Sequence, residues 1–513
     1  MRHALVAFAA ALVLLVSAPA AFATRTMLVP QLDVRTAATG LVTPTTMAFL
    51  STDSALVLEK NTGKVQYLTR SGDTWSIDHT ALDLAVNNSS ERGLLGIAFD
   101  PAFAINHLVY LYWTCTAPPP PPDNPFVPSL LACADTPALG ADTGDILAVP
   151  LLGNRVDRFV WNGASLTFDR NLIKLHAFQN DGAPTPPGQG DESQPPRGNH
   201  NAGVIRFGPD GKLYVIIGDN GRRGQLQNLP SGPTETGLGT AVPDDQFGGP
   251  QPDNAHFTGV VLRLNTDGTA PTDNPFFAAG AAIAGEVGSN LQKTFAYGVR
   301  NSFGLAFDPI SGRLWESENG DTAFDELNQI TAGHNGGWIQ FMGPASRIAQ
   351  FKAIETTPGA FFGLQQLRWP PTRLADTPAE ALSRLFDVPG SHYADPQFSW
   401  KFALAPAGIG FSSSRQLGPQ FLGDLFVGFA TPSPLGGPLF HFNLTGNRRK
   451  LALEDPRLSD LVADNSDLRD MTESESLLVG RDFGIVTDIE TRPNGNLFVV
   501  SLSDGAIYEV HRR

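Results

Sequence analysis

The chain has 513 residues, a formal net charge of −15 and only 17% charged residues. Its 52 glycines and 41 prolines show no collagen-like period, and 42% hydrophobic residues are enough for a large core. This composition excludes a disordered chain and predicts a turn-rich, mostly β protein. The net acidity argues against nonspecific binding to nucleic acid or anionic lipid, since both need a basic surface.

The first 23 residues have the pattern of a secretory signal peptide. A basic start precedes a short apolar run, and Ala21-Phe22-Ala23 supplies an A-x-A cleavage site. The run is shorter than the ~20 residues that a membrane-spanning helix needs, which disfavours an uncleaved anchor. We therefore predict cleavage after Ala23, a periplasmic or secreted mature chain over residues 24–513, and no membrane span within it.

The chain contains two cysteines, Cys115 and Cys133, which flank a proline-rich stretch. In an oxidising compartment this pair predicts a disulfide that closes the short loop between them. Two free buried thiols are the alternative. A metal site is disfavoured because the spacing is wrong and no pair of histidines lies beside the cysteines.

One strand motif recurs along the chain: turn residues, a short apolar strand and a polar break. Clear copies occupy residues 208–215, 308–315, 418–427 and 493–500. Each copy predicts a hairpin whose alternating apolar residues face a core. With two weaker copies nearer the N-terminus, the motif predicts an all-β, six-bladed β-propeller; a β-sandwich is the alternative.

The copies are farther apart than a compact blade of ~40–50 residues requires. We expect the excess to form surface loop inserts rich in proline and glycine, at residues 116–145, 180–198, 228–256 and 341–395. A short helix is predicted near residues 379–385 in the last insert.

Propellers bind ligands on loops around one end of a central channel, so polar clusters beside the repeated strands are candidate sites. His200 lies in a Gly- and Asn-rich loop ahead of a strand, where an imidazole could act as a base near neutral pH. Arg300 and Asn301 precede another strand and combine a cation with an amide, which suits a carbonyl or carboxylate ligand. Both features are also typical of ordinary loop residues.

Two further segments, residues 317–328 and 333–338, are rich in carboxylates, amides and glycines. These groups supply the oxygen ligands that Ca²⁺ prefers, although EF-hand spacing is absent and a solvated acidic loop is the alternative. Glu91 and Arg92 begin an apolar strand motif and are candidates to face the channel.

Nine segments carry a family pattern, in the same order, over nearly the whole mature chain. They are EKNTGKV (59–65), ERGLLGIAFDPAF (91–103), NRVDRFVW (154–161), GNHNAGVIRFGPDGKLYVIIGDNG (198–221), GVVLRLNTDGTAPTDNPF (259–276), YGVRNSFGLAFDP (297–309), SENGDTAFDELNQI (317–330), APAGIGF (405–411) and VTDIETRPNGNLFVV (486–500). Together they resemble the soluble quinoprotein glucose/sorbosone dehydrogenase family. Its members include aldose dehydrogenases that use pyrroloquinoline quinone (PQQ) on a six-bladed propeller.

The resemblance implies roles for individual residues. His200 matches the family's general base, and Arg300 would act in catalysis by polarising the carbonyl of the cofactor. Cofactor contacts are implied for Glu91, Arg300, Asn301 and Asn319.

The resemblance also implies two Ca²⁺ sites. Backbone carbonyls of Gly320 and Asp321 would hold the ion that bridges the protein to PQQ. Glu326 and Gly336 match a second, structural Ca²⁺ site.

Four positions depart from the family pattern. Thr431 stands where the family has a lysine, and Ile485 and Thr487 stand where it has an Arg-x-Arg pair. In the family these cations neutralise the carboxylates of PQQ. Glu91 takes the place of a glutamine.

The sequence therefore predicts an exported oxidoreductase that oxidises an aldose or a related sugar. PQQ would accept the hydride, Ca²⁺ would anchor PQQ, and an external acceptor would take the electrons. A Ca²⁺-stabilised binding module that has lost PQQ and a propeller lactonase are the alternatives, because one fold hosts many chemistries.

Overall fold

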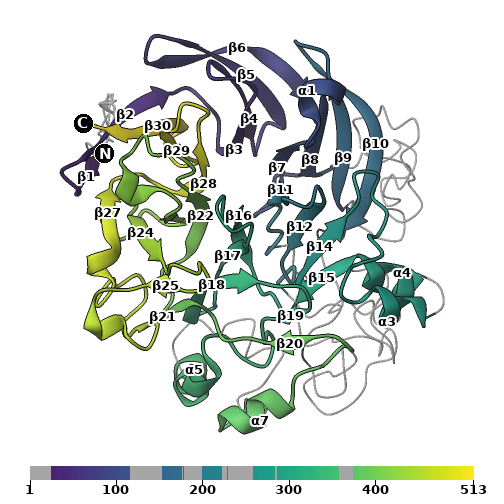
Figure 1. The fold of residues 1–513 in the computed structure, drawn as a ribbon, viewed down its shortest axis with the longest axis vertical. Coiled ribbons are helices and arrows are strands. Elements are labelled where there is room, and N and C mark those ends of the chain that lie inside the picture. The colour runs from purple at the N-terminus through teal and green to yellow at the C-terminus, as the bar shows by residue number, and fades with distance from the viewer. Residues whose placement is uncertain are drawn as a thin grey trace, which may run out of the picture.

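The computed structural model describes residues 25–115, 153–175, 177, 199–221, 228, 258–283, 286–357 and 374–513. Within these residues the strands form six sheets that surround a common axis (Figure 1). The first strands of the sheets contact one another in chain order, and the last of them, β28 (Val486–Thr491), contacts β3 (Pro44–Phe49). The sheets therefore form a closed ring, and the predicted all-β propeller is confirmed.

Three of the sheets contain four antiparallel strands each. The first comprises β3, β4 (Ser54–Glu59), β5 (Lys64–Ser71) and β6 (Thr74–Asp83). The second comprises β7 (Leu94–Phe99), β8 (Leu108–Thr114), β9 (Asn154–Trp161) and β10 (Leu166–Leu175). The last joins β28, β29 (Leu497–Ser501) and β30 (Ala506–Arg512) to the N-terminal β2 (Leu32–Ala38).

The other three sheets add short outer strands to the same plan. The third has β11 (Ile205–Phe207), β12 (Leu213–Ile217), β14 (Val260–Leu264), β15 (Thr294–Tyr297), β19 (His334–Asn335) and β20 (His392–Tyr393). The fourth has β16 (Ser302–Phe307), β17 (Leu314–Glu318), β18 (Ala323–Ile330), β21 (Phe398–Phe402) and β26 (Val462–Ala463). The fifth has β22 (Pro406–Phe411), β23 (Leu425–Phe429), β24 (Leu439–Leu444), β27 (Leu478–Arg481) and β1 (Thr26–Met27), with β25 (Leu451–Ala452) beside β24.

The helices are short. They are α1 (Phe103–Asn106), α3 (Phe277–Ala281), α4 (Glu286–Lys293), α5 (Ile348–Glu355) and α7 (Pro378–Ser383), with 3₁₀ turns at Ala345–Arg347, Pro419–Phe421, Pro456–Leu458 and Glu475–Leu477. In the described part of the chain, no helix has the length and apolar character needed to cross a bilayer.

The recurrent sequence motif is the turn between the first and second strands of a sheet. Its four clear copies join β11 to β12, β16 to β17, β22 to β23, and β28 to β29. The second strands are continuously buried, as in β12, because they pack against neighbouring sheets on both faces. The motif therefore marks the turn at which the chain passes from the innermost strand of a sheet to the next strand outward.

Glycines let the first strands approach one another near the axis. A Cβ atom on Gly96 of β7 would lie 2.2 Å from the carbonyl oxygen of Gly203, and one on Gly304 of β16 would lie 2.2 Å from that of Ala407. Any side chain at these positions would push the strands apart. Gly96 thus also fixes the loop that carries His200.

The two chain ends close the ring. Strand β2 pairs antiparallel with β30, with Leu32 opposite Arg512 and Ala38 opposite Ile507. Figure 1 shows β2 beside β30, with the C-terminus at the end of β30. Hydrogen bonds therefore hold the N-terminal strand β2 in the last sheet, and the chain continues from β2 into β3 of the first sheet.

The predicted loop insert at residues 341–395 is partly a folded element. Phe341, Ile348 and Phe351 are buried in one cluster with Phe324 of β18, so apolar burial orders this segment. Glu355, at the end of α5, accepts hydrogen bonds from the backbone N–H groups of Thr322 and Ala323 at the start of β18. Helix α7, with Pro378 at its first turn, confirms the helix predicted near residues 379–385.

Several predictions concern residues outside the described ranges. These are the signal peptide at residues 1–23, the inserts at 116–145 and 180–198, and nearly all of the insert at 228–256. Cys115 is described and buried beyond β8. Its expected disulfide partner, Cys133, lies outside the described residues, so the pairing stays a prediction.

Candidate functional site

A cavity of about 180 Å³ lies at the end of the channel where the first strands begin. Each first strand, or the loop just before it, contributes to the wall. These residues include Thr45, Leu95, Val204, Phe303, Ala407 and Thr487. The wall is mostly apolar, and Lys60 and Glu91 supply its charges.

Lys60 and Glu91 come from neighbouring loops at this mouth. The Nζ atom of Lys60 donates to the carbonyl oxygens of Asn88 at 3.2 Å and Ser90 at 2.9 Å. Burial lowers the pKa of Lys60, and the nearby charge of Glu91 opposes this shift. The carboxylate of Glu91 accepts the backbone N–H of His200 and so links the cavity wall to the histidine loop.

His200 forms a dyad with Asp219, which follows β12. The Nδ1 atom of His200 lies 2.6 Å from Oδ1 of Asp219, and both side chains are buried. The other carboxylate oxygen of Asp219 accepts the indole N–H of Trp338 at 2.9 Å. Because the aspartate accepts, it places the imidazole proton on Nδ1 and leaves the Nε2 lone pair as the acceptor. The arrangement is that of an oriented general base.

The histidine loop is held in a strained shape. His200 and Ala202 have φ angles of 57° and 49°, in the left-handed region that residues with a Cβ atom rarely adopt. The hydroxyl of Tyr112 donates to the carbonyl of Asn201 at 3.1 Å, and Asn154 donates to the side-chain oxygen of Asn201. Strain of this kind is typical of functional sites.

Arg300 lies next to the dyad, in the loop before β16. Its carbonyl oxygen accepts the backbone N–H of Asp219 at 2.8 Å, and its guanidinium lies 5.5 Å from the centre of the Trp338 ring. The Nη1 atom donates to the carbonyl oxygens of Asn319 at 2.8 Å and Gly320 at 2.7 Å. The guanidinium is buried and fixed, with an ion pair to Asp321 at 3.2 Å.

Asp325 shapes the carbonyl-bearing loop that Arg300 contacts. Its carboxylate accepts the backbone N–H groups of Gly320 at 2.8 Å, and of Leu404 and Ala405 at 2.6 Å each. Burial raises the pKa of Asp325 to about 6, although these hydrogen bonds oppose the rise. Three N–H donors on one carboxylate make the loop rigid.

Three polar atoms beside Arg300 are buried without a hydrogen-bond partner among the described residues. They are Oδ1 of Asn301, Oδ2 of Asp321 and Nε of Arg300. A buried polar atom without a partner is costly, and such atoms are typical of places where a ligand or ion binds. The two oxygens are hard ligands of the kind that Ca²⁺ takes, and the N–H suits a carbonyl oxygen.

A group of buried carboxyls lies behind this loop. The side-chain amide of Asn328 donates to Glu316 at 3.2 Å, Glu318 at 3.3 Å and Glu326 at 2.8 Å. Burial raises the pKa of Glu316 to about 7. Burial and neighbouring carboxylates raise the pKa of Glu326 to about 8 and also raise that of Glu318. The folded protein therefore holds protons here near neutral pH.

We expect the free energy of unfolding to decrease as the pH rises from about 5 to about 8. Unfolded glutamates titrate near ~4.3, so over this range the native state binds more protons than the unfolded state. The contribution is fully present at lower pH and is lost as the pH passes the native pKa values. Glu316→Gln should flatten this dependence, measured by urea unfolding with a chelator present. Glu475→Gln, at an exposed position, is the control, and an unchanged slope in Glu316→Gln would contradict the prediction.

The structure brings together most of the predicted site residues. A continuous chain of contacts joins Glu91, His200, Arg300, Asn301, Asn319, Gly320 and Asp321. The side-chain amide of Asn319 donates to Pro406 O at 2.8 Å, so its backbone carbonyl, rather than its amide, meets Arg300.

The second predicted calcium pair is not joined by a hydrogen bond among the described residues. Glu326 accepts from Gly343 and Asn328, whereas the N–H of Gly336 donates to Tyr297 O at 2.9 Å. Over the described ranges, no group of three or more His, Cys, Asp or Glu side chains is arranged to hold a metal ion.

Two residues of the site were not predicted from the sequence. Asp219 orients His200, and Trp338 donates to Asp219 and packs against Arg300. Asp219 lies two residues beyond the buried strand β12, and this position was the available signal. Ile485 and Thr487, two of the positions that depart from the family pattern, line the cavity as their alignment implies. Thr431 is buried nearby, one residue beyond the cavity residue Ala430.

Comparison with known proteins connects this site to a family. The model for glucose / sorbosone dehydrogenase matches residues 41–124 and 190–347. Quinoprotein glucose dehydrogenase B of Acinetobacter calcoaceticus is 26% identical over 293 residues, which are 56% of this chain and 48% of that protein. Aldose sugar dehydrogenase YliI of Escherichia coli is 25% identical over 323 residues, 62% of this chain and 61% of that protein. The matched region thus spans less than two thirds of either relative.

Solved structures support the fold. The soluble aldose sugar dehydrogenase of Escherichia coli in its apo-form gives a TM-score of 0.57 at 19% identity, covering 94% of this chain and 100% of that one. The PQQ-bound aldose sugar dehydrogenase of Streptomyces coelicolor gives 0.52 at 21% identity, covering 94% and 99%. The family model and the two dehydrogenase relatives support a glucose/sorbosone dehydrogenase-like family for this chain, and the solved structures show that it shares their propeller fold.

Proposed function

We propose that the protein is an exported sugar dehydrogenase that uses PQQ and Ca²⁺ and passes electrons to an external acceptor. The scaffold is a six-bladed propeller, with one blade for each sheet. The observation that carries the proposal is the buried His200–Asp219 dyad, joined through Trp338 and backbone contacts to Arg300. A base for the hydroxyl proton and a fixed cation for the developing negative charge suit the oxidation of a sugar hydroxyl by a bound hydride acceptor.

The residues at this mouth fit the two proposed cofactors. Arg300 and Asn301 offer an N–H donor and an amide oxygen that are buried without a hydrogen-bond partner in the described part of the chain. Asp321 and the carbonyl of Gly320 offer oxygens for Ca²⁺. Ile485 and Thr487 supply no cation to the cavity wall, and Lys60 would meet a carboxylate there by exchanging one of its contacts to Asn61, Asn88 and Ser90.

PQQ, when bound, supplies the acceptor for a hydride. The protein's own residues would handle the proton and the charge. Nε2 of His200 takes the proton from the hydroxyl being oxidised, and Asp219 stabilises the imidazolium that results. Arg300 stabilises negative charge on a neighbouring oxygen, and it needs no reorganisation because Asn319, Gly320 and Asp321 already hold it.

Cofactor binding tests the proposal directly. Apoprotein titrated with PQQ and Ca²⁺ should change the absorbance of the quinone and melt at a higher temperature, since a ligand of the native state stabilises it. The loaded protein should then reduce a redox dye when given aldoses. Neither a spectral change nor a melting shift at saturating PQQ and Ca²⁺ would contradict it and favour a binding module without quinone.

A further inference from the structure

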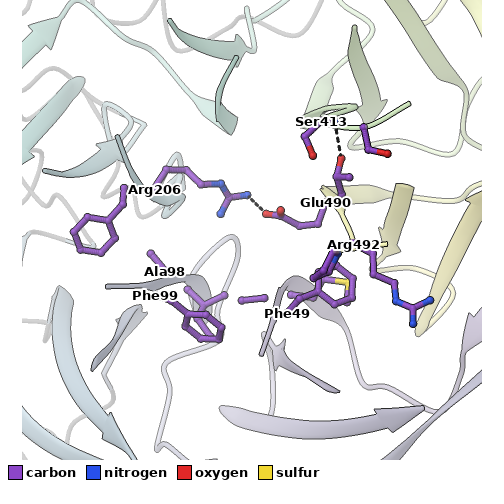
Figure 2. Close-up of a pocket in the computed structure, with 14 residues that line it drawn as sticks. Phe49, Ala98, Phe99, Arg206, Ser413, Glu490 and Arg492 are labelled. Atoms are coloured by element: carbon purple, nitrogen blue, oxygen red, sulfur yellow. Dashed lines mark hydrogen bonds and ion pairs between the residues drawn. The ribbon is translucent and has the colours of Figure 1, made fainter. Parts of the chain in front are cut away.

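A second and larger cavity lies at the opposite end of the channel. It has a volume of about 470 Å³, within the ~300–1,000 Å³ that is usual for ligand pockets. Its wall comes from the ends of the first strands and from the residues just beyond them, including Phe49, Phe99, Phe207, Ser413 and Glu490. Figure 2 shows Arg206 reaching across this cavity toward Glu490, with Phe49 and Phe99 on one side.

An ion pair separates the two cavities. Arg206 of β11 lies 2.8 Å from Oδ1 of Asp488 in β28, and the other oxygen of Asp488 accepts the hydroxyl of Thr46 at 2.6 Å. The space left between these side chains is about 10 Å³, roughly the volume that one water needs. The larger cavity is therefore a compartment of its own, separate from the proposed catalytic site.

The charges in the larger cavity are paired. Arg206 contacts both Asp488 and Glu490, the latter at 3.0 Å. Arg492 is paired with Asp53 at 3.2 Å and lies 3.7 Å from Glu509. Each arginine therefore contacts a carboxylate, so the cavity offers no unpaired positive charge to a small anion.

The remaining groups suit a polyol. Rings of Phe49, Phe99 and Phe207 give an apolar wall. Glu490 offers acceptors and Arg206 offers donors across the same space, and charge-assisted hydrogen bonds of this kind are strong. A ligand with an apolar ring face and adjacent hydroxyl groups satisfies both features.

We propose that the cavity at the C-terminal ends of the first strands binds a neutral carbohydrate, separately from the oxidised substrate. The ring face packs on the phenyl wall, and paired hydroxyls bridge Arg206 and Glu490. The site lies beyond the Arg206–Asp488 ion pair and therefore holds its sugar without presenting it to His200. Its role is binding, not oxidation.

Two non-reducing sugars test this site, methyl α-D-glucopyranoside and trehalose. Neither has a free anomeric hydroxyl to oxidise, and the apoprotein is used without PQQ, so the result does not depend on the proposed activity. Calorimetry and saturation-transfer NMR should detect binding of at least one probe. Glu490→Gln should weaken binding at least about tenfold, because it removes a charge-assisted hydrogen bond.

Ser413→Trp, at an exposed position on the cavity wall, should block the same binding. Ser459→Trp, exposed and distant in sequence from the cavity residues, and His200→Ala should bind as the wild type does. Unchanged melting temperatures would show that the cavity variants are folded. Failure of the wild type to bind either probe, or unchanged affinity in both cavity variants, would overturn the proposal.

Discussion

Replacing His200 with alanine should lower kcat for aldose oxidation by about 10²–10⁴-fold while PQQ and Ca²⁺ still bind. The imidazole is the base of the buried dyad, and the groups assigned to the cofactors belong to Arg300, Asn301 and the loop after β17. The loss should therefore appear in kcat, measured in steady state with a redox dye. The quinone titration of the apoprotein should be nearly unchanged.

Asp219→Asn separates orientation from proton transfer. The amide keeps the size of the side chain but can turn its N–H₂ group toward Nδ1, which would leave the wrong imidazole nitrogen protonated. We expect a large loss of kcat and an altered pH profile for this variant as well. His511→Ala is the matched histidine control, because the imidazole of His511 contacts the neighbouring carbonyl oxygen of Arg512 at 3.0 Å, away from the site. Full turnover in His200→Ala would contradict the assignment of the base.

Only one member of the His200–Asp219 dyad could be predicted from the sequence. His200 stands out in the sequence because it lies in a Gly- and Asn-rich loop ahead of a strand, although the folded protein buries its imidazole. Asp219 was not identified, although it lies only 19 residues away, because its role depends on how β11 and β12 pair. That antiparallel pairing brings the segment that follows β12, with Asp219, beside the segment that precedes β11, with His200. The register of β11 against β12 determines which residue lies beside His200. The sequence motif does not specify that register.

The propeller fold could be predicted from the sequence, but the strand pairing that closes its ring could not. Local turn chemistry recurs at each first hairpin, so the propeller follows from repeated short-range signals. The pairing of β2 with β30 joins segments more than 450 residues apart and has no turn between them. Likewise, the segment after Trp338 reads as a loop insert, yet Phe341 and Phe351 are buried against Phe324. Burial of a few apolar residues against a distant strand is a tertiary effect that local patterns do not contain.

Arg300→Ala should weaken PQQ binding and lower kcat by about 10²–10³-fold, because one fixed donor beside a developing charge contributes about that much. It should also destabilise the protein, since two carbonyl oxygens and the carboxylate of Asp321 would lose their buried partner. This combination of effects distinguishes Arg300 from His200, which should alter turnover alone. Quinone titration, dye reduction and thermal melting of each variant measure the three quantities.

Arg300→Lys tests whether charge or geometry matters. A lysine keeps the positive charge but lacks the planar fork that reaches Asn319 O, Gly320 O and Asp321 together, so we expect only partial recovery of binding and turnover. Arg313→Ala, in the turn before β17, is the control for loss of an arginine outside the site. If Arg300→Ala bound PQQ and turned over as the wild type does, the prediction would be wrong. The guanidinium would then serve only to stabilise the loop after β17. If Arg300→Lys were fully active, charge alone would suffice, and the network that fixes the guanidinium would serve stability, not catalysis.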